Sequence, residues 1–534
     1  MTQIFDNALL FDPAVGEWLP AAFSVEDGRV AIVGKPGSLL GDNVTDLCGA
    51  RVVPGLIDAH VHIESSLLTP REFGRLSLKN GVTTVIADPH EIANVSGCAG
   101  IDFMLEDAKS SPADIFFMIP SCVPATPMDK GGAVVSSKDI ASYKGTPSVI
   151  GLGEMMNVPG VLSGDPEVLA KIAVFDHVDG HAPGLSGEAL CRYISRNIKT
   201  DHECISASEG NEKLSLGMYV LLREGDAAKN VAALSSIVND RTAARCCFCT
   251  DDRHVDSRVR EGSIDHCIRV AVRSGMSLEH ALRLATLSAA DCFGLTDRGM
   301  IAPGKVADFC ILQDGPKFFV SEVYKNGVRT SSLPNPGRSS NCICPPFSCR
   351  IPAIKELALP AGRLRVIGLV PGEIITEVLD SGTARDLHKV VSVDRYRSEG
   401  FGVGLVKGFS FVKGAIASSV SHDAHNIIAA GVTDEEIIQA VTAVKDSGGG
   451  MAVVCDGITT VLPLPCGGLM TPLPYVGVAK QMDDLTERLT VTGAKPSAFM
   501  NLSFLSLTVI PHLRITPRGL FDGDTFKDVS ILFE

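Results

Sequence analysis

The stretch Pro54-Gly55-Leu56-Ile57-Asp58-Ala59-His60-Val61-His62 decides how the fold is interpreted. Its apolar residues, together with the Pro-Gly pair, predict a buried strand that is entered through a break in the chain. His60 and His62 are two residues apart, so in a strand both imidazoles project from the same face. Two neutral nitrogen donors at the end of a rigid element suit a divalent transition metal. A bare His-x-His can equally be two unrelated histidines, so the rest of the chain has to decide.

The sequence after Pro54 alternates short apolar, β-branched runs with stretches of helical spacing. Such runs lie at residues 82–88, 115–119, 148–152 and 174–175, and polar or turn residues follow each of them. Repeated strand–loop–helix units predict a parallel sheet covered by helices, and about eight units in ~240 residues fit an α/β fold of the (β/α)8 TIM-type barrel class. In that architecture, the polar residues just past the strand ends gather at one mouth.

Both flanks of the predicted barrel have a β character. Residues 23–34 predict a hairpin with its turn at Asp27-Gly28. Residues 277–294 predict one helix, and strands at 307–312 and 320–328 are expected to join the N-terminal strands. We therefore predict a composite small β domain (1–53 and 299–332) and a barrel (54–298).

An additional C-terminal α+β domain is expected at 347–534, after a linker at 331–346 that is rich in Ser, Pro, Asn and Gly. It contains one clear helix, which starts with a capping box at Thr433 and Glu436 and ends at 448–450.

The content of 45% hydrophobic and 21% charged residues indicates a soluble globular protein. A net charge of −14 disfavours nucleic acid and anionic membranes as partners. The N-terminus does not resemble a signal peptide, and the uncharged stretch 457–479 has too many Pro and Gly residues for a membrane helix. We expect a cytoplasmic protein whose 16 cysteines are reduced, and a homo-oligomer, dimer or tetramer. Cys342, Cys344 and Cys349 lack the paired Cys-x-x-Cys of a zinc knuckle.

Further polar residues follow the predicted strands. They are Asp88-Pro89-His90-Glu91, Glu154, Asp179-Gly180-His181, Asp201-His202-Glu203 and Thr250-Asp251-Asp252. Each alone has an ordinary explanation as a loop histidine or a helix cap. Because barrel geometry sends all of them to the same end, together with His60 and His62 they predict a metal site at the mouth.

At this point the motifs resemble a known family. The stretch 54–62 resembles the opening motif of the amidohydrolase superfamily of metal-dependent hydrolases, and 299–312 its closing β segment. More specifically, four motifs resemble the bacterial-type adenine deaminase family within it. They are His60-Val61-His62-Ile63-Glu64-Ser65-Ser66, Ala87-Asp88-Pro89-His90-Glu91-Ile92, Gly153-Glu154-Met155-Met156-Asn157 and Ser421-His422-Asp423-Ala424-His425-Asn426.

The resemblance implies a metal-dependent hydrolysis of adenine to hypoxanthine and ammonia, as in purine salvage or catabolism, with adenine and water as the small-molecule partners. It implies a divalent metal, most often Mn²⁺, with Fe²⁺ possible and Zn²⁺ less favoured, in a binuclear centre. Carried over by position, it implies that His60 and His62 bind one ion beside Asp251, that His181 and His202 bind the second, and that Glu154 bridges them. Many relatives bridge with a carboxylated lysine, which Glu154 replaces here.

The chemistry can also be argued from the reaction. Displacing ammonia from C6 of a purine needs a strong nucleophile at neutral pH, which a metal-activated water supplies. Asp251 is the candidate to move the nucleophile's proton to the leaving amine, and Glu91 to protonate the ring nitrogen, although Glu91 can equally be a salt-bridged loop carboxylate. The remaining candidates for substrate binding or for support of the ligands are His90, Asn157, Asp252, His422, Asp423 and His425. The segment 421–426 is expected to reach over the mouth, unless it is only a polar turn.

Two alternatives stay open. One is another amidohydrolase reaction, such as deacetylation of an amino sugar or opening of a cyclic amide, which needs the same metal chemistry at a carbonyl. The other is a non-catalytic scaffold that has lost its metals, which predicts broken ligand sets, whereas every ligand position here is filled.

Overall fold

The structure, a computed structural model, describes residues 2–313, 315, 317–337, 339, 343, 347–371 and 373–533. Cys342, Cys344 and much of the predicted linker lie outside the described residues. Within the described part of the chain, none of the helices has both the length and the apolar character needed to cross a membrane.

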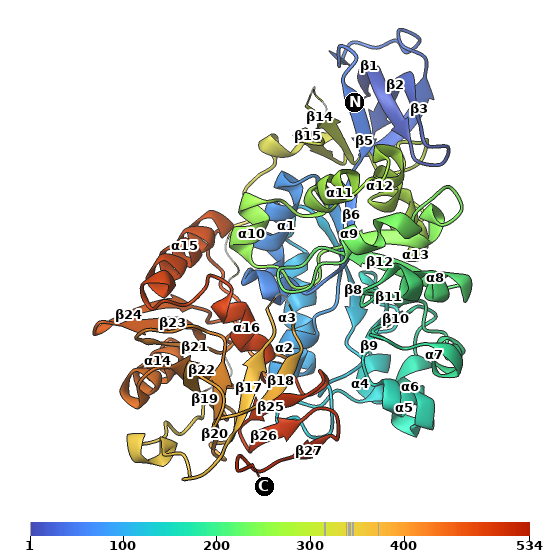
Figure 1. Cartoon of the computed structure of the whole chain (residues 1–534). Coiled ribbons are helices and arrows are strands. Elements are labelled where there is room, and N and C mark those ends of the chain that lie inside the picture. Colours follow the sequence, from blue (N-terminus) through green and yellow to red (C-terminus); the bar gives the residue numbers. More distant parts are fainter. Residues whose placement is uncertain are drawn as a thin grey trace.

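The centre of the molecule is built from parallel strands in two sheets (Figure 1). The strands are β6 (Leu56–Val61), β7 (Val82–Ala87), β8 (Asp114–Ile119), β9 (Val149–Met155), β10 (Val178–Gly180), β11 (Thr200–Asp201), β12 (Tyr219–Arg223) and β13 (Cys246–Cys249). One sheet has the order β10-β9-β8-β7-β6 and the other the order β11-β12-β13. Single parallel bridges, Val178 to Ile198 and Val61 to Asp251, link the sheets at both edges.

Helices connect these strands. They are α1 (Pro70–Lys79), α2 (His90–Ser96), α3 (Cys98–Ala108), α4 (Ser137–Ala141), α5 (Val158–Ser163), α6 (Pro166–Ile172), α7 (Gly187–Ile194), α8 (Ala207–Ser215) and α9 (Val231–Leu234), with α10 (Val255–Arg260) and α11 (Ile264–Arg273) after β13. Each turns an apolar side toward the strands. In α7, for example, Leu190 and Tyr193 are buried while the acidic and basic residues face outward.

Most predicted strands of this region are confirmed, with two differences. The run 174–175 lies in a turn, and the strand begins only at Val178 (β10). Strand β12 was not predicted, although its sequence Tyr-Val-Leu-Leu-Arg has the same apolar character and ends in the same kind of charged residue as its neighbours.

The single helix predicted at 277–294 is wrong, because the chain forms two helices, α12 (Leu278–Leu284) and α13 (Leu287–Cys292). Thr286 between them has non-helical dihedral angles. The carbonyl of Ala285 accepts the backbone N–H of Ile57 in β6 at 2.8 Å, so it bonds to the sheet instead of continuing the helical ladder. The predicted N-cap is confirmed, since the Ser277 hydroxyl accepts the backbone N–H of His280.

A mixed sheet at one end of the molecule combines strands from both flanks of the parallel region (Figure 1). Its members are β1 (Gln3–Asp12), β2 (Glu17–Glu26), β3 (Arg29–Gly34), β4 (Val44–Asp46), β5 (Arg51–Pro54), β14 (Phe309–Leu312), β15 (Val320–Lys325) and β16 (Val328–Arg329). The predicted hairpin is present as β2–β3, with Asp27 and Gly28 both at positive φ. The chain passes from this sheet into β6 at Gly55, where a Cβ atom would lie 2.2 Å from the Thr83 hydroxyl, so the close approach requires glycine.

The C-terminal region forms a second layered unit beside the parallel strands (Figure 1). Its large sheet has the order β18-β17-β20-β19-β22-β21-β23-β24. These strands are β17 (Arg365–Leu369), β18 (Thr376–Asp380), β19 (Leu387–Val393), β20 (Phe401–Lys407), β21 (Ala415–Ser418), β22 (Ile427–Gly431), β23 (Gly450–Cys455) and β24 (Ile458–Pro463). A small sheet of β25 (Leu513–Thr516), β26 (Gly519–Asp522) and β27 (Lys527–Asp528) follows.

Three helices belong to this unit: α14 (Asp434–Asp446), α15 (Tyr475–Val491) and α16 (Ala498–Phe504). The predicted start of α14 is confirmed, since the Thr433 hydroxyl accepts the backbone N–H of Glu436. Ile437, Val441 and Val444 of this helix are fully buried against the sheet.

The prediction that all cysteines are reduced is wrong at one position, because Cys466 takes part in a disulfide. Thirteen other cysteines among the described residues are free, and most of them are buried, including Cys349. Burial between apolar neighbours explains why the thiols of β13 pack as small hydrophobic groups.

Candidate active site

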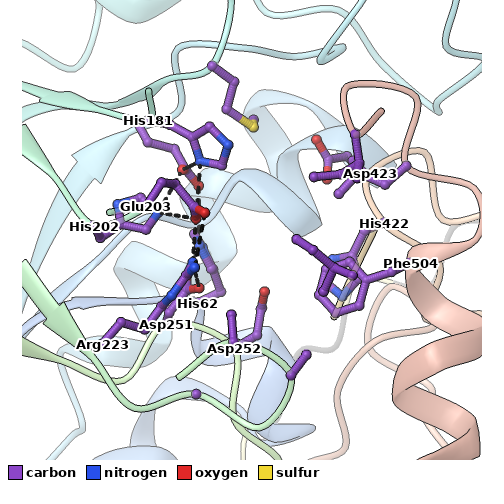
Figure 2. Close-up of a pocket in the computed structure, with 18 of the residues that line it drawn as sticks. His62, His181, His202, Glu203, Arg223, Asp251, Asp252, His422, Asp423 and Phe504 are labelled. Carbon is purple, nitrogen blue, oxygen red and sulfur yellow. Dashed lines mark hydrogen bonds and ion pairs between the residues drawn. The ribbon is translucent and has the colours of Figure 1, made fainter. Parts of the chain in front are cut away.

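The predicted metal ligands meet at the carboxyl ends of the parallel strands. His60 lies in β6, and His62 comes directly after it. Glu154 lies near the end of β9, while the other three follow β10, β11 and β13, in the order His181, His202 and Asp251. Figure 2 shows the labelled members of this cluster pointing toward one another. Because parallel strands end at a common edge, residues almost two hundred positions apart share one site.

One side of the cluster is built around His60, His62 and Asp251. The Nε2 atoms of the two histidines are 3.2 Å apart, and Asp251 Oδ1 lies 3.1 Å from His62 Nε2 and 3.6 Å from His60 Nε2. All three residues are buried. His62 Nδ1 lies 2.9 Å from the Asp88 carbonyl oxygen, to which it donates, so the lone pair of His62 is on the Nε2 that faces the cluster.

Glu154 lies between two sets of histidines. Its Oε1 is 3.3 Å from His62 Nε2, whereas its Oε2 is 2.7 Å from His181 Nδ1 and 3.2 Å from His202 Nε2. Each carboxylate oxygen therefore faces a different group of donors. Burial favours the neutral form, but the surrounding imidazoles hold the pKa of Glu154 well below its ordinary value.

Among the charged residues of the cluster, Arg223 was not predicted, whereas its partner Glu203 was expected only as one of the strand-end polar residues, with no role assigned to it. Arg223, at the end of β12, donates to Glu203 Oε2 at 3.0 Å and to Asp251 Oδ2 at 2.7 Å. Glu203 Oε1 also lies 3.3 Å from His202 Nε2. Although burial alone would raise the pKa of Asp251, the Arg223 guanidinium and the histidines hold it well below its ordinary value. Arg223 follows an apolar run, as the other strand-end residues do, and that signal could have found it.

Glu91 is held by two histidines from the C-terminal region. His422 Nδ1 contacts Glu91 Oε1 and His425 Nε2 contacts Glu91 Oε2. The Ser421 backbone N–H donates to His425 Nδ1 at 3.1 Å, so His425 carries its proton on Nε2 and donates it to Glu91. Burial lowers the pKa of His425 to about 4 despite the neighbouring carboxylate. For His422, Glu91 outweighs burial and raises the pKa to about 9, which makes it a cation at neutral pH.

A cavity lies between the cluster and the C-terminal region. The cluster residues except His60 line it on the side of the parallel strands, together with His90, Glu91 and Asp252, and its other wall includes Ile374, His422, Asp423, Phe504, Leu507 and Ile510. The ring of Phe504 stacks on His422 with 4.6 Å between centroids. Figure 2 shows Asp423, His422 and Phe504 across the cavity from the cluster. The segment 421–426 therefore lies at the mouth and is more than a polar turn.

The other candidate residues have separate positions. His90 Nδ1 lies 3.5 Å from Glu154 Oε1, and Asp252 accepts a hydrogen bond from the Ser65 hydroxyl. His425 lies behind Glu91 and does not line the cavity. Asn157 caps α5 by accepting the Gly160 backbone N–H at 2.9 Å, and its side chain lines a neighbouring apolar cavity of about 480 Å³.

The donor set fits a divalent metal. Buried imidazoles and carboxylates converge within ligand distance, in groups such as His60, His62 and Asp251 or His60, Glu154 and His202. Imidazole and carboxylate donors suit manganese, iron or zinc. Glu154, Glu203 and Asp251 bring three carboxylates together, and Arg223 is the cation paired with two of them. A bound cation would balance the remaining negative charge.

Comparison with known proteins agrees with this geometry. Residues 51–330 match the amidohydrolase family, and residues 370–527 match the adenine deaminase C-terminal domain. A protein of Methanoculleus marisnigri named adenine deaminase is 51% identical over 96% of this chain and 100% of its own length. The chain belongs to the adenine deaminase family. A second member, from Methanoregula boonei, is 50% identical over 99% of this chain and 96% of its own length.

Among solved structures, a β-aspartyl dipeptidase from Fervidobacterium islandicum is similar over 62% of this chain and 96% of its own, with 19% identity and a TM-score of 0.46. Membership of the adenine deaminase family makes the chain a hydrolase and implies a divalent metal. The second wall of the cavity comes from the region that matches the adenine deaminase C-terminal domain.

Proposed function

We propose that this chain hydrolyses adenine to hypoxanthine and ammonia. One observation carries the proposal. Five of the six proposed metal ligands line a cavity whose opposite wall comes from the segment that matches the adenine deaminase C-terminal domain, and the sixth, His60, lies beside them. The names of the relatives, which align over nearly the whole chain, support the same substrate. A flat, aromatic base suits a cavity with one polar and one apolar wall.

We assign the metal ligands from the contacts of Glu154. His60, His62 and Asp251 would hold one ion, His181 and His202 the other, and Glu154 would join both, because its two oxygens face different donors. Mn²⁺ is the favoured ion of this binuclear centre, with Fe²⁺ possible and Zn²⁺ less favoured. When bound, a divalent ion lowers the pKa of water towards about 7 and supplies hydroxide at neutral pH.

Asp251 is the proposed proton carrier of the reaction. As the C6–O bond forms, its carboxylate takes up the proton of the attacking oxygen. As the C6–N bond breaks, it returns this proton to the amino group, which leaves as ammonia. Arg223 supports this role by holding Asp251 Oδ2 at 2.7 Å, which leaves Oδ1 directed at the cluster.

Protonation of the ring nitrogen beside C6 is proposed to come from the pair formed by Glu91 and His422. Both oxygens of Glu91 are engaged by histidines, so Glu91 itself orients and charges His422. His422 lines the cavity and can face the base with its other nitrogen, Nε2. The proton therefore leaves through His422, and Glu91 acts behind it.

The test is a substrate screen with the purified, Mn²⁺-loaded chain. Adenine, adenosine and cytosine are incubated separately, and ammonia release and product formation are followed. We expect ammonia and hypoxanthine from adenine, and activity that disappears when a chelator removes the metal. Turnover of adenosine without turnover of the free base would refute the proposed substrate, and turnover after complete metal removal would refute the mechanism.

We also propose a domain architecture, an oligomeric state and a location in the cell. The single bridges at both sheet edges support closure of β6–β13 into a (β/α)8 barrel at 54–298, flanked by a composite β domain (1–53 and 299–332) and followed by a C-terminal domain at 347–534. Edge strands β18 and β24 leave backbone groups available for pairing, which supports a homo-oligomer. The many free cysteines support a cytoplasmic location. Light scattering of the purified protein tests the oligomer.

A further inference from the structure

One carboxyl group of the cavity is set apart by its surroundings. The lining contains the carboxyl groups of Glu91, Glu154, Glu203, Asp251, Asp252 and Asp423. The first five each have a hydrogen bond or ion pair to a basic or hydroxyl side chain. Among the residues that the structure describes, Asp423 Oδ2 is buried and has no hydrogen-bond partner.

Asp423 is also well placed to meet a ligand. The residue is 5% exposed, it follows His422 in the segment 421–426, and Figure 2 shows it across the cavity from the metal cluster. Buried polar atoms in native proteins nearly always have a partner, so an unpaired carboxyl oxygen at a cavity wall is best explained by a ligand that supplies the missing donor.

The chemistry of the free base identifies that donor. In the proposed reaction, C6 with its amino group and the neighbouring ring nitrogen must face the cluster and His422. The five-membered ring of adenine then lies at the far end of the base, and a free base carries one N–H there. Burial raises the pKa of Asp423 to about 7, so the ionised form is available at and above neutral pH. In that form the carboxylate accepts hydrogen bonds only, so it can pair with this N–H but cannot pair with a nitrogen that bears a sugar.

We infer that the Asp423 carboxyl accepts the imidazole N–H of a free purine base and so selects the base over its nucleosides. The inference rests on the proposed function and deepens it, because it names the residue that binds the edge of the base farthest from the reacting C6 atom. A site built around a substrate N–H rejects an analogue without it strongly, since the buried acceptor is then left unpaired.

The experiment compares adenine with its thiazolopyrimidine analogue, in which sulfur replaces the N9–H without adding a substituent. Wild type, Asp423→Asn and a control, Asp456→Asn, are assayed as Mn²⁺-loaded full-length proteins. Asp456 lies at the exposed surface of the C-terminal region, paired with Lys413, far from the cavity lining. We expect wild type and the control to prefer adenine by about 100-fold in kcat/KM. Because the Asn amide oxygen is a neutral acceptor in place of a charged one, kcat/KM for adenine in Asp423→Asn should fall by about 10-fold, while that for the analogue changes by less than about 3-fold.

Equal losses for both compounds in Asp423→Asn, or no loss for either, would overturn the inference. Metal content and the unfolding temperature are measured for each variant, so a misfolded protein is recognised. Binding of hypoxanthine and of its sulfur analogue by calorimetry repeats the comparison without turnover. If wild type does not release ammonia from adenine, the proposed function fails, and this binding ratio still decides the role of Asp423.

Discussion

The two walls of the cavity contrast in chemistry and in origin. The side of the parallel strands presents imidazoles, carboxylates and Arg223 from the strand ends, whereas the C-terminal side presents Phe504, Leu507, Ile510, His422 and Asp423 from loops and one helix. In the proposed mechanism, the first wall would hold the ions and activate the nucleophile, whereas the second would hold the base, orient it and protonate its ring nitrogen through His422. The contrast teaches that activation of the nucleophile and selection of the substrate are carried by separate parts of the chain. Substitutions on the two walls should therefore fail in different ways.

The largest loss of activity is expected for Glu154→Gln, on the wall formed by the ends of the parallel strands. The neutral amide of Gln is a weaker metal ligand than a carboxylate, so the binding of both proposed ions should be weakened or lost. We expect kcat to fall by at least about 10⁴-fold. Metal analysis and steady-state kinetics measure the two effects. Glu188→Gln, on the exposed side of α7, is the control with unchanged metal and activity. Full metal content in Glu154→Gln would contradict the proposed bridging position.

A smaller loss is expected for Arg223→Lys. An ammonium group cannot reproduce the contacts that the guanidinium makes with Glu203 and Asp251 together, so Asp251 should lose its orientation. We expect kcat to fall by about 10²- to 10³-fold, with KM changed much less. The control is Arg245→Lys, whose side chain lies over the Tyr219 ring at the surface. A change confined to KM would instead assign Arg223 to substrate binding.

On the C-terminal wall, Phe504→Ala should weaken substrate binding without affecting metal binding. The change removes the ring that stacks on His422 and lines the cavity, so kcat/KM for adenine should fall by about 100-fold, mainly through KM. Metal content should equal that of wild type, unlike in Glu154→Gln. Phe319→Ala, which truncates an exposed ring directly before β15, provides the matched control. Loss of metal from Phe504→Ala would show that the two walls do not have separate roles.

The smallest effect concerns the contact between the walls, the pair of His422 and Glu91. Glu91 raises the pKa of His422 from 6.5 to about 9, so the pair stabilises the fold fully below about pH 6.5. This contribution is lost as the pH rises to about 9, because His422 then loses its proton in the folded protein as well. Its size is on the order of 3 kcal/mol, at about 1.4 kcal/mol for each unit of the pKa shift.

Denaturant unfolding of the apo protein at about pH 6 and about pH 9.5 measures this term. The difference in the free energy of unfolding between the two values should be larger for wild type than for His422→Gln. Identical pH dependence of both proteins would show that the charge of His422 does not hold the two walls together.

The sequence predicts the first wall much better than the second. His60, His62, Glu154, His181, His202 and Asp251 were found because a single rule, that strand ends meet at one edge, places them without knowledge of packing. Arg223 obeys the same rule and was missed only because β12 was overlooked. Phe504, Leu507 and Ile510 follow no such rule, because their position depends on how the C-terminal region packs against the parallel strands.

The motif at 421–426 falls between these cases. Its polar residues pointed to a functional loop, but nothing local could reveal that His422 and His425 grip Glu91, more than 300 residues away. The break at Thr286 has a similar cause. Helical propensity runs through 277–294, and a hydrogen bond from β6 overrides it.

The origin of the second wall also has a consequence for how the protein is made. The chain leaves the ribosome from its N-terminus, so every proposed ligand from His60 to Asp251 has emerged before His422 and Phe504 are synthesised. During this interval the wall that contains His422 and Phe504 is missing from the cavity, so the proposed ligands lack the cover that this wall provides in the folded protein.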